Sequence, residues 1–484
     1  DRLAGDGRGI EDVYPLSPLQ HGLLFHTLYQ PGAGAYIAPM SCVLEGELDV
    51  AALQRAWQAV IDRHPVLRSS FVWEGLGRPH QIVHRRVGLP WEELDWRDLT
   101  PIEQETRREE LIAAQGRDGF DLSRAPLMRL TLIHTGPRSW TFIWGRHHLL
   151  VDGWTTSRLL NEVFGFYGAF AGGRAFEPPP SRPYGDYIAW LERQDLAVAE
   201  SWWRRTLAGF TAPTPLPAPP EAVAPEVGED GAGEEHLPLT AEEASRLEEV
   251  AQRHRVTLNT LFQGAWALLL AHHAGTSDVV FGGVVAGRPY DLPGAESIVG
   301  PFINTLPVRV RLSPEAPLAE WLRSLQEEQA EQRQLEHSPL VEVQGWSDVP
   351  RGLPLFTSIL VFENYPGELA AGDGRLRARD IRHSVRNSYP LTLRVVPAGT
   401  LELHALFDRR HVRPETAAAI LGRLRLLLRR MAEVSEEPLR TVSGVLAEED
   451  ARRLAEREKA YDQALFERFK SVRRRAAVET GGES

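Results

Sequence analysis

The segment from Arg146 to Trp154, RHHLLVDGW, carries the residue types in this chain that could do chemistry. Residues 140–147 alternate as in a β-strand, so the adjacent side chains of His147 and His148 point to opposite faces. Two histidines so placed cannot easily bind one metal ion together. We therefore expect one imidazole to enter the core and the other to face a cavity, where it can accept or relay a proton near neutral pH.

Asp152 and Gly153 follow the histidines in a tight loop, which Gly153 permits because it lacks a Cβ atom. From the residue types alone, three interpretations stay open: a histidine pair that only serves the structure, acid–base chemistry at one histidine, and metal binding, the least favoured of the three. A second pair, His272 and His273, ends an apolar helix and is interpreted as a polar cap of that helix.

The sequence lacks the motifs of several other chemistries. It contains no Gly-x-x-x-x-Gly-Lys loop for a nucleotide and no Gly-x-Ser-x-Gly elbow for a nucleophilic serine. Cys42 is the single cysteine and lies in an apolar run, which favours core packing and excludes an intrachain disulfide or a cysteine-based metal cluster. The net charge of -12 argues against nucleic-acid binding.

The periodicity of apolar residues predicts the elements that position this segment. Residues 49–64 predict an amphipathic helix, and residues 127–134 and 140–147 predict two strands joined by a turn that contains Gly and Pro. A helix should follow the histidine loop, and residues 184–207 also have a helical pattern. The first half of the chain therefore combines helices and strands.

A second unit begins after residues 211–235, a Pro-rich and acidic connector. Thr240 and Glu243 predict a capping box, followed by an apolar helix at 259–273 and a buried strand at 278–285. Because helices and strands lie on both sides of the connector without strict alternation, we expect two α/β lobes, each with a mixed sheet.

The ends of the chain differ from the rest. The chain starts with Asp and has no signal peptide or apolar run long enough to span a membrane, so we interpret it as a cytoplasmic piece of a longer polypeptide. Residues 448–484 form a tail that is locally basic between 468 and 475 and holds both lysines, 459 and 470. This tail is interpreted as a solvated linker or as a docking helix for a partner.

The sequence HHLLVDG at 147–153 resembles the signature of condensation domains of non-ribosomal peptide synthetases. Other segments resemble the remaining motifs of that family in the same order: YPLSPLQ at 14–20, RHPVLR at 63–68, YGDY at 184–187, VGPFINT at 299–305, HSPL at 337–340 and NSYPL at 387–391. The resemblance extends over about residues 10–445.

The resemblance implies an α/β fold of two lobes similar to chloramphenicol acetyltransferase, which form a V-shaped pseudo-dimer with a central tunnel. The N-terminal lobe would comprise residues 1–176 and the C-terminal lobe residues 177–447, with the connector at 211–235 and the tail at 448–484 outside the pattern. A monomer within a larger synthetase is expected.

The resemblance also implies a reaction, amide-bond formation between a donor thioester and an acceptor amine. Both substrates would be carried on the phosphopantetheine arms of partner carrier domains, one upstream and one downstream. No cofactor would be bound by the domain itself, and no metal, nucleic acid or membrane would take part.

Carried over by motif, His148 would be the catalytic histidine, acting either as a base or by orienting the amine. His147 would support it from the core. Asp152 would pair with Arg288, and Gly153 would lie near the thioester. Trp154 and Asn304 would shape the tunnel.

The segments at 14–20, 71–75 and 338–344 resemble the subtype that accepts a D-configured donor residue and an L-acceptor. The alternatives are an epimerization domain, an acyltransferase that releases product onto a soluble amine, and a non-catalytic platform that recruits partners. The continuation Trp154-Thr155-Thr156 favours condensation over epimerization, and two histidines in place of aspartates exclude heterocyclization.

Overall fold

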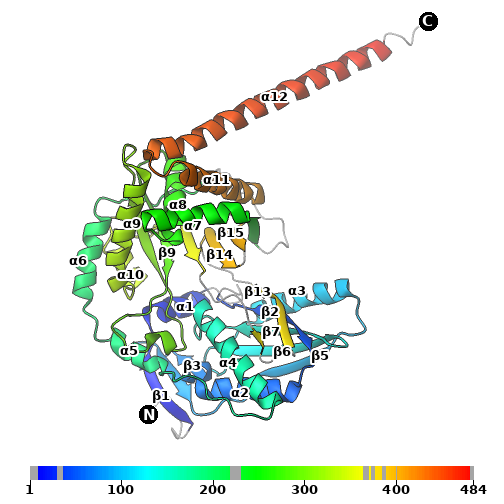
Figure 1. Cartoon of the computed structure of the whole chain (residues 1–484), viewed down its shortest axis with the longest axis vertical. Helices are drawn as coiled ribbons and strands as arrows, with labels where there is room; N and C mark the ends of the chain where they lie inside the picture. Colours follow the sequence, from blue (N-terminus) through cyan, green and yellow to red (C-terminus); the bar gives the residue numbers. More distant parts are fainter. Residues whose placement is uncertain are drawn as a thin grey trace.

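The computed structural model describes residues 9–29, 36–217, 231–363, 370–371, 376–383, 389–398 and 400–479. Part of the predicted connector and of the motif at 387–391, as well as both ends of the chain, lie outside these residues. The described residues form two lobes, each built on a six-stranded mixed sheet (Figure 1). The two-lobed α/β architecture predicted from the sequence is therefore confirmed.

The first lobe contains a large sheet and a small one. The large sheet has the strand order β12 (Ala370–Ala371), β13 (Leu376–His383), β2 (Met40–Gly46), β7 (Ser139–Arg146), β6 (Met128–Gly136) and β5 (Trp91–Asp95). The small sheet has the order β1 (Ile10–Pro15), β4 (His80–His84) and β3 (Ser69–Val72). Its helices are α1 (Pro18–Tyr29), α2 (Val50–Arg63), α3 (Pro101–Asp118), α4 (Gly153–Ala171) and α5 (Tyr184–Leu191), and a 3-10 turn, Pro65–Arg68, follows α2.

Apolar periodicity determines how α2 packs on the large sheet. Asp49 caps the helix, since its side chain accepts a hydrogen bond from the Ala52 N–H at 2.9 Å. Leu53, Trp57, Val60 and Ile61 share one face and are buried. The predicted helix at 49–64 is thus confirmed within one residue at each end.

The second lobe has the strand order β10 (Asn304–Arg311), β9 (Asp278–Val285), β11 (Ser358–Phe362), β14 (Leu391–Ala398), β15 (Thr400–Asp408) and β8 (Ala232–Pro238). Its helices are α6 (Leu196–Leu207), α7 (Ala241–His254), α8 (Leu258–Ala274), α9 (Leu318–Gln332), α10 (Leu340–Gly345), α11 (Pro414–Glu433) and α12 (Leu439–Glu479), with 3-10 turns at Ala295–Ser297 and Arg333–Leu335. The predicted capping box of Thr240 and Glu243 begins α7.

Two sequence predictions in this region are wrong in part. The pattern at 184–207 predicts one helical stretch, but α5 and α6 are separate helices, because Asp195 caps a new helix by accepting from the Ala197 N–H at 2.9 Å. The end of the predicted connector is also structured, since residues 232–238 form β8 and pair with β15. Pairing with a sheet edge orders a segment whose composition resembles a linker.

Two segments of the second half of the chain pack on the first lobe. Strand β13 pairs antiparallel with β2, interrupted by an irregularity between Arg379 and Arg382. Residues 286–302 also reach the first lobe, and Leu292, Ile298 and Phe302 belong to its hydrophobic core. The predicted boundary at residue 176 assigns both segments to the C-terminal lobe. In the structure, β13 joins the sheet of the first lobe, and residues 286–302 pack in its core.

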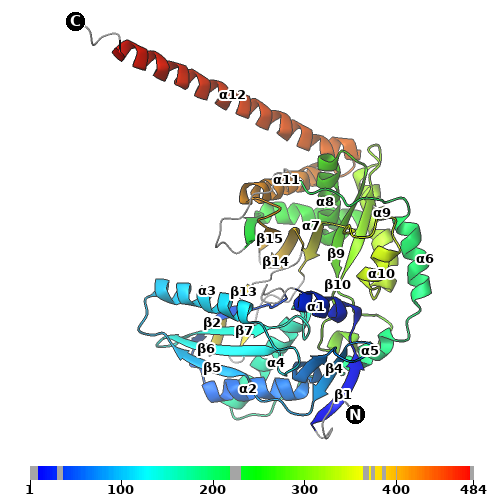
Figure 2. The ribbon, with the colours of Figure 1, turned by 180° about the vertical axis from the view of Figure 1, so that it is seen from behind.

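Helix α12 starts in the second lobe and then leaves it. Leu439, Val442 and Leu446 are buried in that lobe's core, and Asp450 pairs with His272 of α8 at 2.8 Å. Beyond this point the helix extends away from both lobes (Figure 2). The first part of the predicted tail is thus anchored. In the described part of the chain, no helix is both long and apolar enough to span a membrane.

Candidate active site

The histidine loop lies between β7 and α4 and is held by neighbouring backbone. The His147 N–H donates to the Leu127 carbonyl at 3.0 Å, and the His148 N–H donates to the Tyr36 carbonyl at 2.9 Å. The Leu150 N–H closes a turn by donating to the His147 carbonyl at 3.0 Å. Both histidines therefore stand on backbone fixed by β6 and by the chain that leads into β2.

His147 faces the core, as predicted for one of the two histidines. Its side chain is buried, its Nδ1 accepts from the Leu149 N–H at 3.1 Å, and its Nε2 lies 3.3 Å from the Thr27 hydroxyl of α1. Burial, and after it the charge of the neighbouring His148, lowers the pKa of His147 to about 3. With both nitrogens occupied, this neutral ring supports the loop.

His148 is partly exposed, and one of its two ring nitrogens is available to a substrate. One ring nitrogen hydrogen-bonds the backbone of Val151, which fixes the orientation of the ring. Burial, followed by the positive charge of Arg146, lowers the pKa of His148 to about 4, against the opposing effects of Val151 and Asp152. At neutral pH the ring is therefore uncharged, and its second nitrogen is a hydrogen-bond acceptor.

Asp152 joins the histidine loop to the segment that arrives from the second half of the chain. Its carboxylate is buried and accepts two backbone hydrogen bonds, from Thr155 at 2.8 Å and from Phe302 at 2.9 Å. The first bond caps α4. The second holds residues 286–302, called the crossing segment below because they pass from the second lobe to the first. The predicted ion pair between Asp152 and Arg288 is not formed, because backbone N–H groups occupy the carboxylate instead.

Arg288 is linked to this carboxylate through Thr155, which accepts a hydrogen bond from Arg288 and donates one to Asp152. Its guanidinium donates to the carbonyls of Ala295 at 2.6 Å and Ile298 at 3.0 Å and to the Thr155 hydroxyl at 3.2 Å. The guanidinium also lies 4.1 Å above the ring of Phe302. Burial lowers the pKa of Arg288, and the charge of Asp152 opposes that shift.

The remaining predicted residues lie around the same junction. Gly153 is the first residue of α4, and Trp154 beside it is 40% exposed, enough to contact a bound molecule. Asn304 begins β10, and its amide donates to the carbonyls of Glu336 at 2.9 Å and Ser338 at 2.8 Å. These bonds tie β10 to the segment before α10, so the amide of Asn304 acts on the protein's own backbone.

Sequence reasoning did not identify the role of Gln20, which supports the loop from below. Its buried side chain donates to the Leu149 carbonyl at 2.9 Å and to Gln81 at 2.8 Å. Gln81 in turn donates to the Tyr14 hydroxyl at 3.1 Å. In the sequence, Gln20 is marked only as the last residue of the segment at 14–20, and its residue type alone does not indicate its partner.

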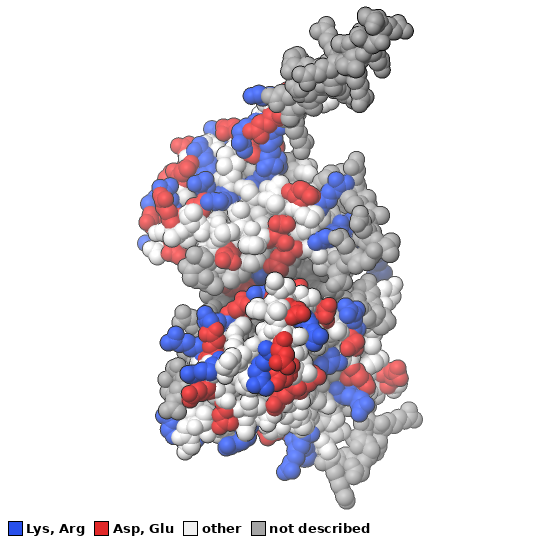
Figure 3. Space-filling model, turned by 90° about the vertical axis from the view of Figure 1, so that its right-hand side faces the viewer, with Lys and Arg blue, Asp and Glu red and all other residues white. Residues whose placement is uncertain are grey.

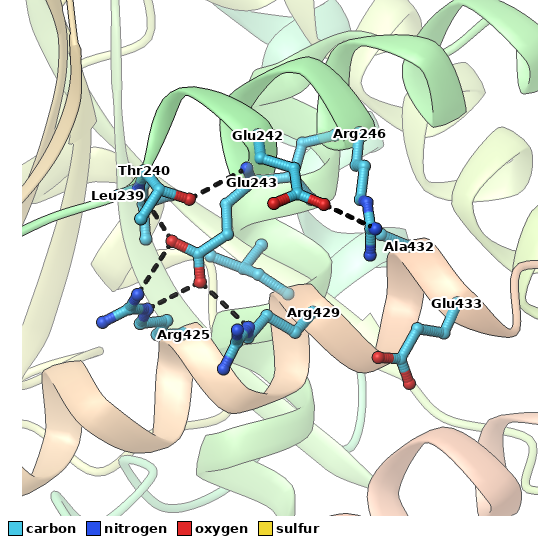
Figure 4. A pocket seen from close by; sticks show the side chains of 11 residues that line it. Leu239, Thr240, Glu242, Glu243, Arg246, Arg425, Arg429, Ala432 and Glu433 are labelled. Carbon is cyan, nitrogen blue, oxygen red and sulfur yellow. Dashed lines mark hydrogen bonds and ion pairs between the residues drawn. The ribbon is translucent and has the colours of Figure 1, made fainter.

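A surface pocket lies in the second lobe between α7 and α11, away from the histidine loop (Figure 4). Its central carboxylate, Glu243, is bonded by Arg425 at 2.7 Å and by Arg429 at 3.0 Å, and it also completes the cap of α7. Glu242 and Arg246 pair beside it at 2.7 Å. These charges neutralise one another and connect α7 to α11. We therefore place the active site at His148 rather than in this pocket.

The described residues contain no group of three or more His, Cys, Asp or Glu side chains arranged to hold a metal ion. Acidic and basic side chains are mixed over both lobes on the face in Figure 3. A mixed face of this kind differs from the single-sign patch that attracts a polyelectrolyte.

Known proteins resemble this chain over most of its length. The family model described as Condensation domain matches residues 10–454. One subunit of the linear gramicidin synthase of Brevibacillus parabrevis is 43% identical over 92% of this chain, and bacitracin synthase 3 of Bacillus licheniformis is 32% identical over 94%. The chain spans only 6% and 7% of the length of these relatives.

Solved structures share the fold. The condensation domain of the Monacolin K polyketide synthase MokA has a TM-score of 0.75 at 19% identity and covers 89% of this chain and 100% of its own. The first condensation domain of the calcium-dependent antibiotic synthetase, bound to a substrate analogue, has a TM-score of 0.74 at 18% identity and covers 89% and 98%.

Proposed function

The chain belongs to the condensation domain family of non-ribosomal peptide synthetases, acyltransferases that form amide bonds, and we propose that it joins two carrier-bound substrates. The donor is a peptidyl or aminoacyl thioester and the acceptor is an L-amino acid with a free amine. Both are held on phosphopantetheine arms, which enter a tunnel between the lobes. The acceptor nitrogen bonds to the thioester carbon and the carbon–sulfur bond breaks. The proton that the nitrogen loses passes to the departing sulfur, which leaves as a thiol.

The observation that carries this proposal is the state of His148. Its ring is partly exposed, uncharged at neutral pH and oriented through the Val151 backbone. Such a ring can accept a hydrogen bond from the acceptor amine and direct the nitrogen lone pair at the thioester. A pKa of about 4 disfavours an imidazolium at neutral pH, so we assign His148 to orienting the amine rather than to holding its proton.

The second part of the proposal concerns the configuration of the donor residue. The segments at 14–20, 71–75 and 338–344 support a donor whose C-terminal residue has the D configuration. Thr155 follows Trp154 and is committed to the junction with the crossing segment, because its hydroxyl donates to the Gly300 carbonyl at 2.8 Å. The continuation Trp154-Thr155-Thr156 supports condensation over epimerization, since the epimerization motif usually continues Val-Ser-Trp.

A reconstituted reaction tests the proposal. One carrier protein is loaded with a D-ended or an L-ended aminoacyl donor and a second carrier with an acceptor, and the dipeptide is followed on the acceptor carrier by intact-protein mass spectrometry. We expect dipeptide from the D-donor, and His148→Ala should lower its rate by about 100-fold, the cost of a misplaced amine, while leaving the melting temperature near that of the wild type.

The outcomes separate the alternatives. Equal rates from both donors would contradict the D-donor assignment and leave condensation intact. A wild-type rate in His148→Ala would remove His148 from the reaction. No dipeptide with any loaded pair would overturn the proposal, and exchange of solvent deuterium at the donor Cα would then identify epimerization, while product on a free amine would identify release.

A further inference from the structure

Tyr36 directly precedes the backbone that pairs with the histidine loop, and its own backbone is strained. Its φ is +66°, in the left-handed region, which bulky side chains rarely adopt. Glycine would make the same turn without strain. Strained residues of this kind persist where the surrounding structure holds them, most often at functional sites. A tyrosine at this φ therefore points to a functional contribution from this position.

The backbone of residues 36–38 anchors His148 from one side. The Tyr36 carbonyl accepts from the His148 N–H at 2.9 Å, and Ile37 forms an antiparallel bridge with His147. One residue further, the Ala38 N–H donates to the Arg146 carbonyl at 2.8 Å. The dihedral angles of residue 36 set the direction of its carbonyl. The left-handed turn therefore fixes the hydrogen bond between the Tyr36 carbonyl and the backbone N–H of His148.

The ring of Tyr36 lies beside α1 and near Tyr389 of the second lobe. Its centroid is 6.1 Å from that of His26 on α1. Tyr389, which precedes β14, is stacked on Phe356 of the second lobe at 5.5 Å. Burial raises the pKa of Tyr389, and Tyr36 raises it further, which means that the two phenols are electrostatic neighbours. Both tyrosines are partly exposed.

We propose that Tyr36 serves the reaction in two separable ways: its left-handed backbone positions His148, and its ring contacts the thioester-bearing arm of the substrate beside His148. The ring offers an apolar face and a phenol, which suit the methylene and amide groups of a pantetheine-like chain. This inference rests on the proposed role of His148.

Two substitutions separate the two contributions. Tyr36→Gly keeps the left-handed turn and removes the ring, whereas Tyr36→Val removes the ring and also disfavours the turn, because a β-branched residue is a clear outlier at positive φ. Both variants should raise KM for the loaded donor by about tenfold, since both lack the ring contact. Only Tyr36→Val should lower kcat, by about 10- to 100-fold, because it displaces His148.

A matched control separates positioning from general strain. Arg255 also has a left-handed backbone, with φ of +58°, at the end of α7 in the second lobe. Arg255→Val should lower the melting temperature about as much as Tyr36→Val and leave kcat within about twofold. If Tyr36→Val does not fold, Tyr36→Thr, a smaller β-branched residue, takes its place in the comparison.

The result decides each part of the inference. An unchanged KM in Tyr36→Gly would overturn the ring contact, and equal kcat values for Tyr36→Gly and the β-branched variant would overturn the positioning role. His148→Ala is measured in the same assay. If wild type is active and His148→Ala is not, wild-type kinetics in the Tyr36 variants defeat this inference alone. An inactive wild type defeats the proposed function instead.

Discussion

At the scale of single residues, two neighbouring histidines have different surroundings. His147 uses both ring nitrogens, toward Leu149 and Thr27, whereas His148 uses one toward Val151. A strand-like alternation separates the two rings, and burial lowers the pKa of both. Position in the fold, rather than residue type, makes one ring a support and leaves the other with an acceptor for substrate.

This burial predicts an acid-sensitive stability. The folded-state pKa values of about 3 for His147 and about 4 for His148 lie below the ordinary value of 6.5, so between these values the unfolded chain binds more protons. The stabilisation is complete above about pH 6.5 and is lost as the pH falls toward about 4 and 3. Each histidine should contribute a slope of at most about 1.4 kcal/mol per pH unit, reached between the two pKa values.

Urea unfolding between about pH 6.5 and 4.5 measures this slope, and His148→Asn provides the comparison because it removes one titrating ring. The free energy of unfolding of His148→Asn should fall less steeply, by about 1 kcal/mol per pH unit on average over this range. Identical slopes for the variant and the wild type would contradict the depressed pKa of His148.

At the scale of elements, residues 286–302 fold back on themselves at Gly287 and dock on α5 at Gly300. A Cβ atom at Gly287 would lie 1.9 Å from the Phe302 carbonyl oxygen, and one at Gly300 would lie 2.1 Å from the Tyr184 ring. Tyr184 also donates its hydroxyl to the Pro301 carbonyl at 2.8 Å. Close approach at these points lets the Phe302 N–H reach Asp152, so the glycines determine how the crossing segment meets the histidine loop.

The docking predicts an unequal cost for two glycine substitutions. Gly287 and Gly209 both have positive φ, +62° and +77°, but a Cβ atom at Gly209 would meet nothing within 4 Å. Gly209→Ala should lower the free energy of unfolding by about 1–2 kcal/mol, the cost of the left-handed backbone alone. Gly287→Ala adds overpacking of about 1–3 kcal/mol. Equal losses in urea unfolding would show that residues 286–302 shift freely.

At the scale of the whole molecule, the second half of the chain is tied to the first lobe twice, by residues 286–302 and by β13. Strand β13 covers one edge of β2, and Arg382 pairs with Glu105 of α3 at 2.9 Å, while Arg379 pairs with Glu45. These ion pairs are partly exposed, so their contribution is small and sensitive to salt. The contact between the lobes therefore depends on a strand next to the edge of the sheet, held in part by charge.

Cys42 of β2 provides a probe of this contact. It is the single cysteine of the chain, it is buried in the first lobe's core, and it lies opposite the irregularity in β13. Arg379→Glu places like charges at Glu45 and should raise the rate of thiol labelling of Cys42 by about fivefold, corresponding to about 1 kcal/mol. Added salt should raise the wild-type rate and lower that of the variant.

Arg97→Glu is the matched control, because Arg97 pairs with Asp95 at 2.6 Å at the opposite edge of the same sheet. It should leave the labelling rate within about twofold of wild type. An equal increase in both variants would mean that Cys42 reports opening of the whole lobe rather than release of β13.

The sequence by itself determined the local features of this protein. Helix α2, the strands β6, β7 and β9, and the capping box of α7 follow from apolar periodicity and from caps, which act within a few residues. The same local reasoning separated His147 from His148, because the alternation of side chains along a strand needs no tertiary contact. The motif at 147–153 then indicated the family to which the chain belongs.

Only the tertiary structure decided which distant groups meet. The carboxylate of Asp152 bonds the Phe302 N–H instead of Arg288, Gln20 supports Leu149, and the Tyr36 carbonyl holds His148. The strand β13 completes a sheet of the other half of the chain. Such contacts join backbone groups and strand edges far apart in sequence. Every residue but proline carries the same backbone donor and acceptor, so residue types alone cannot specify the partners.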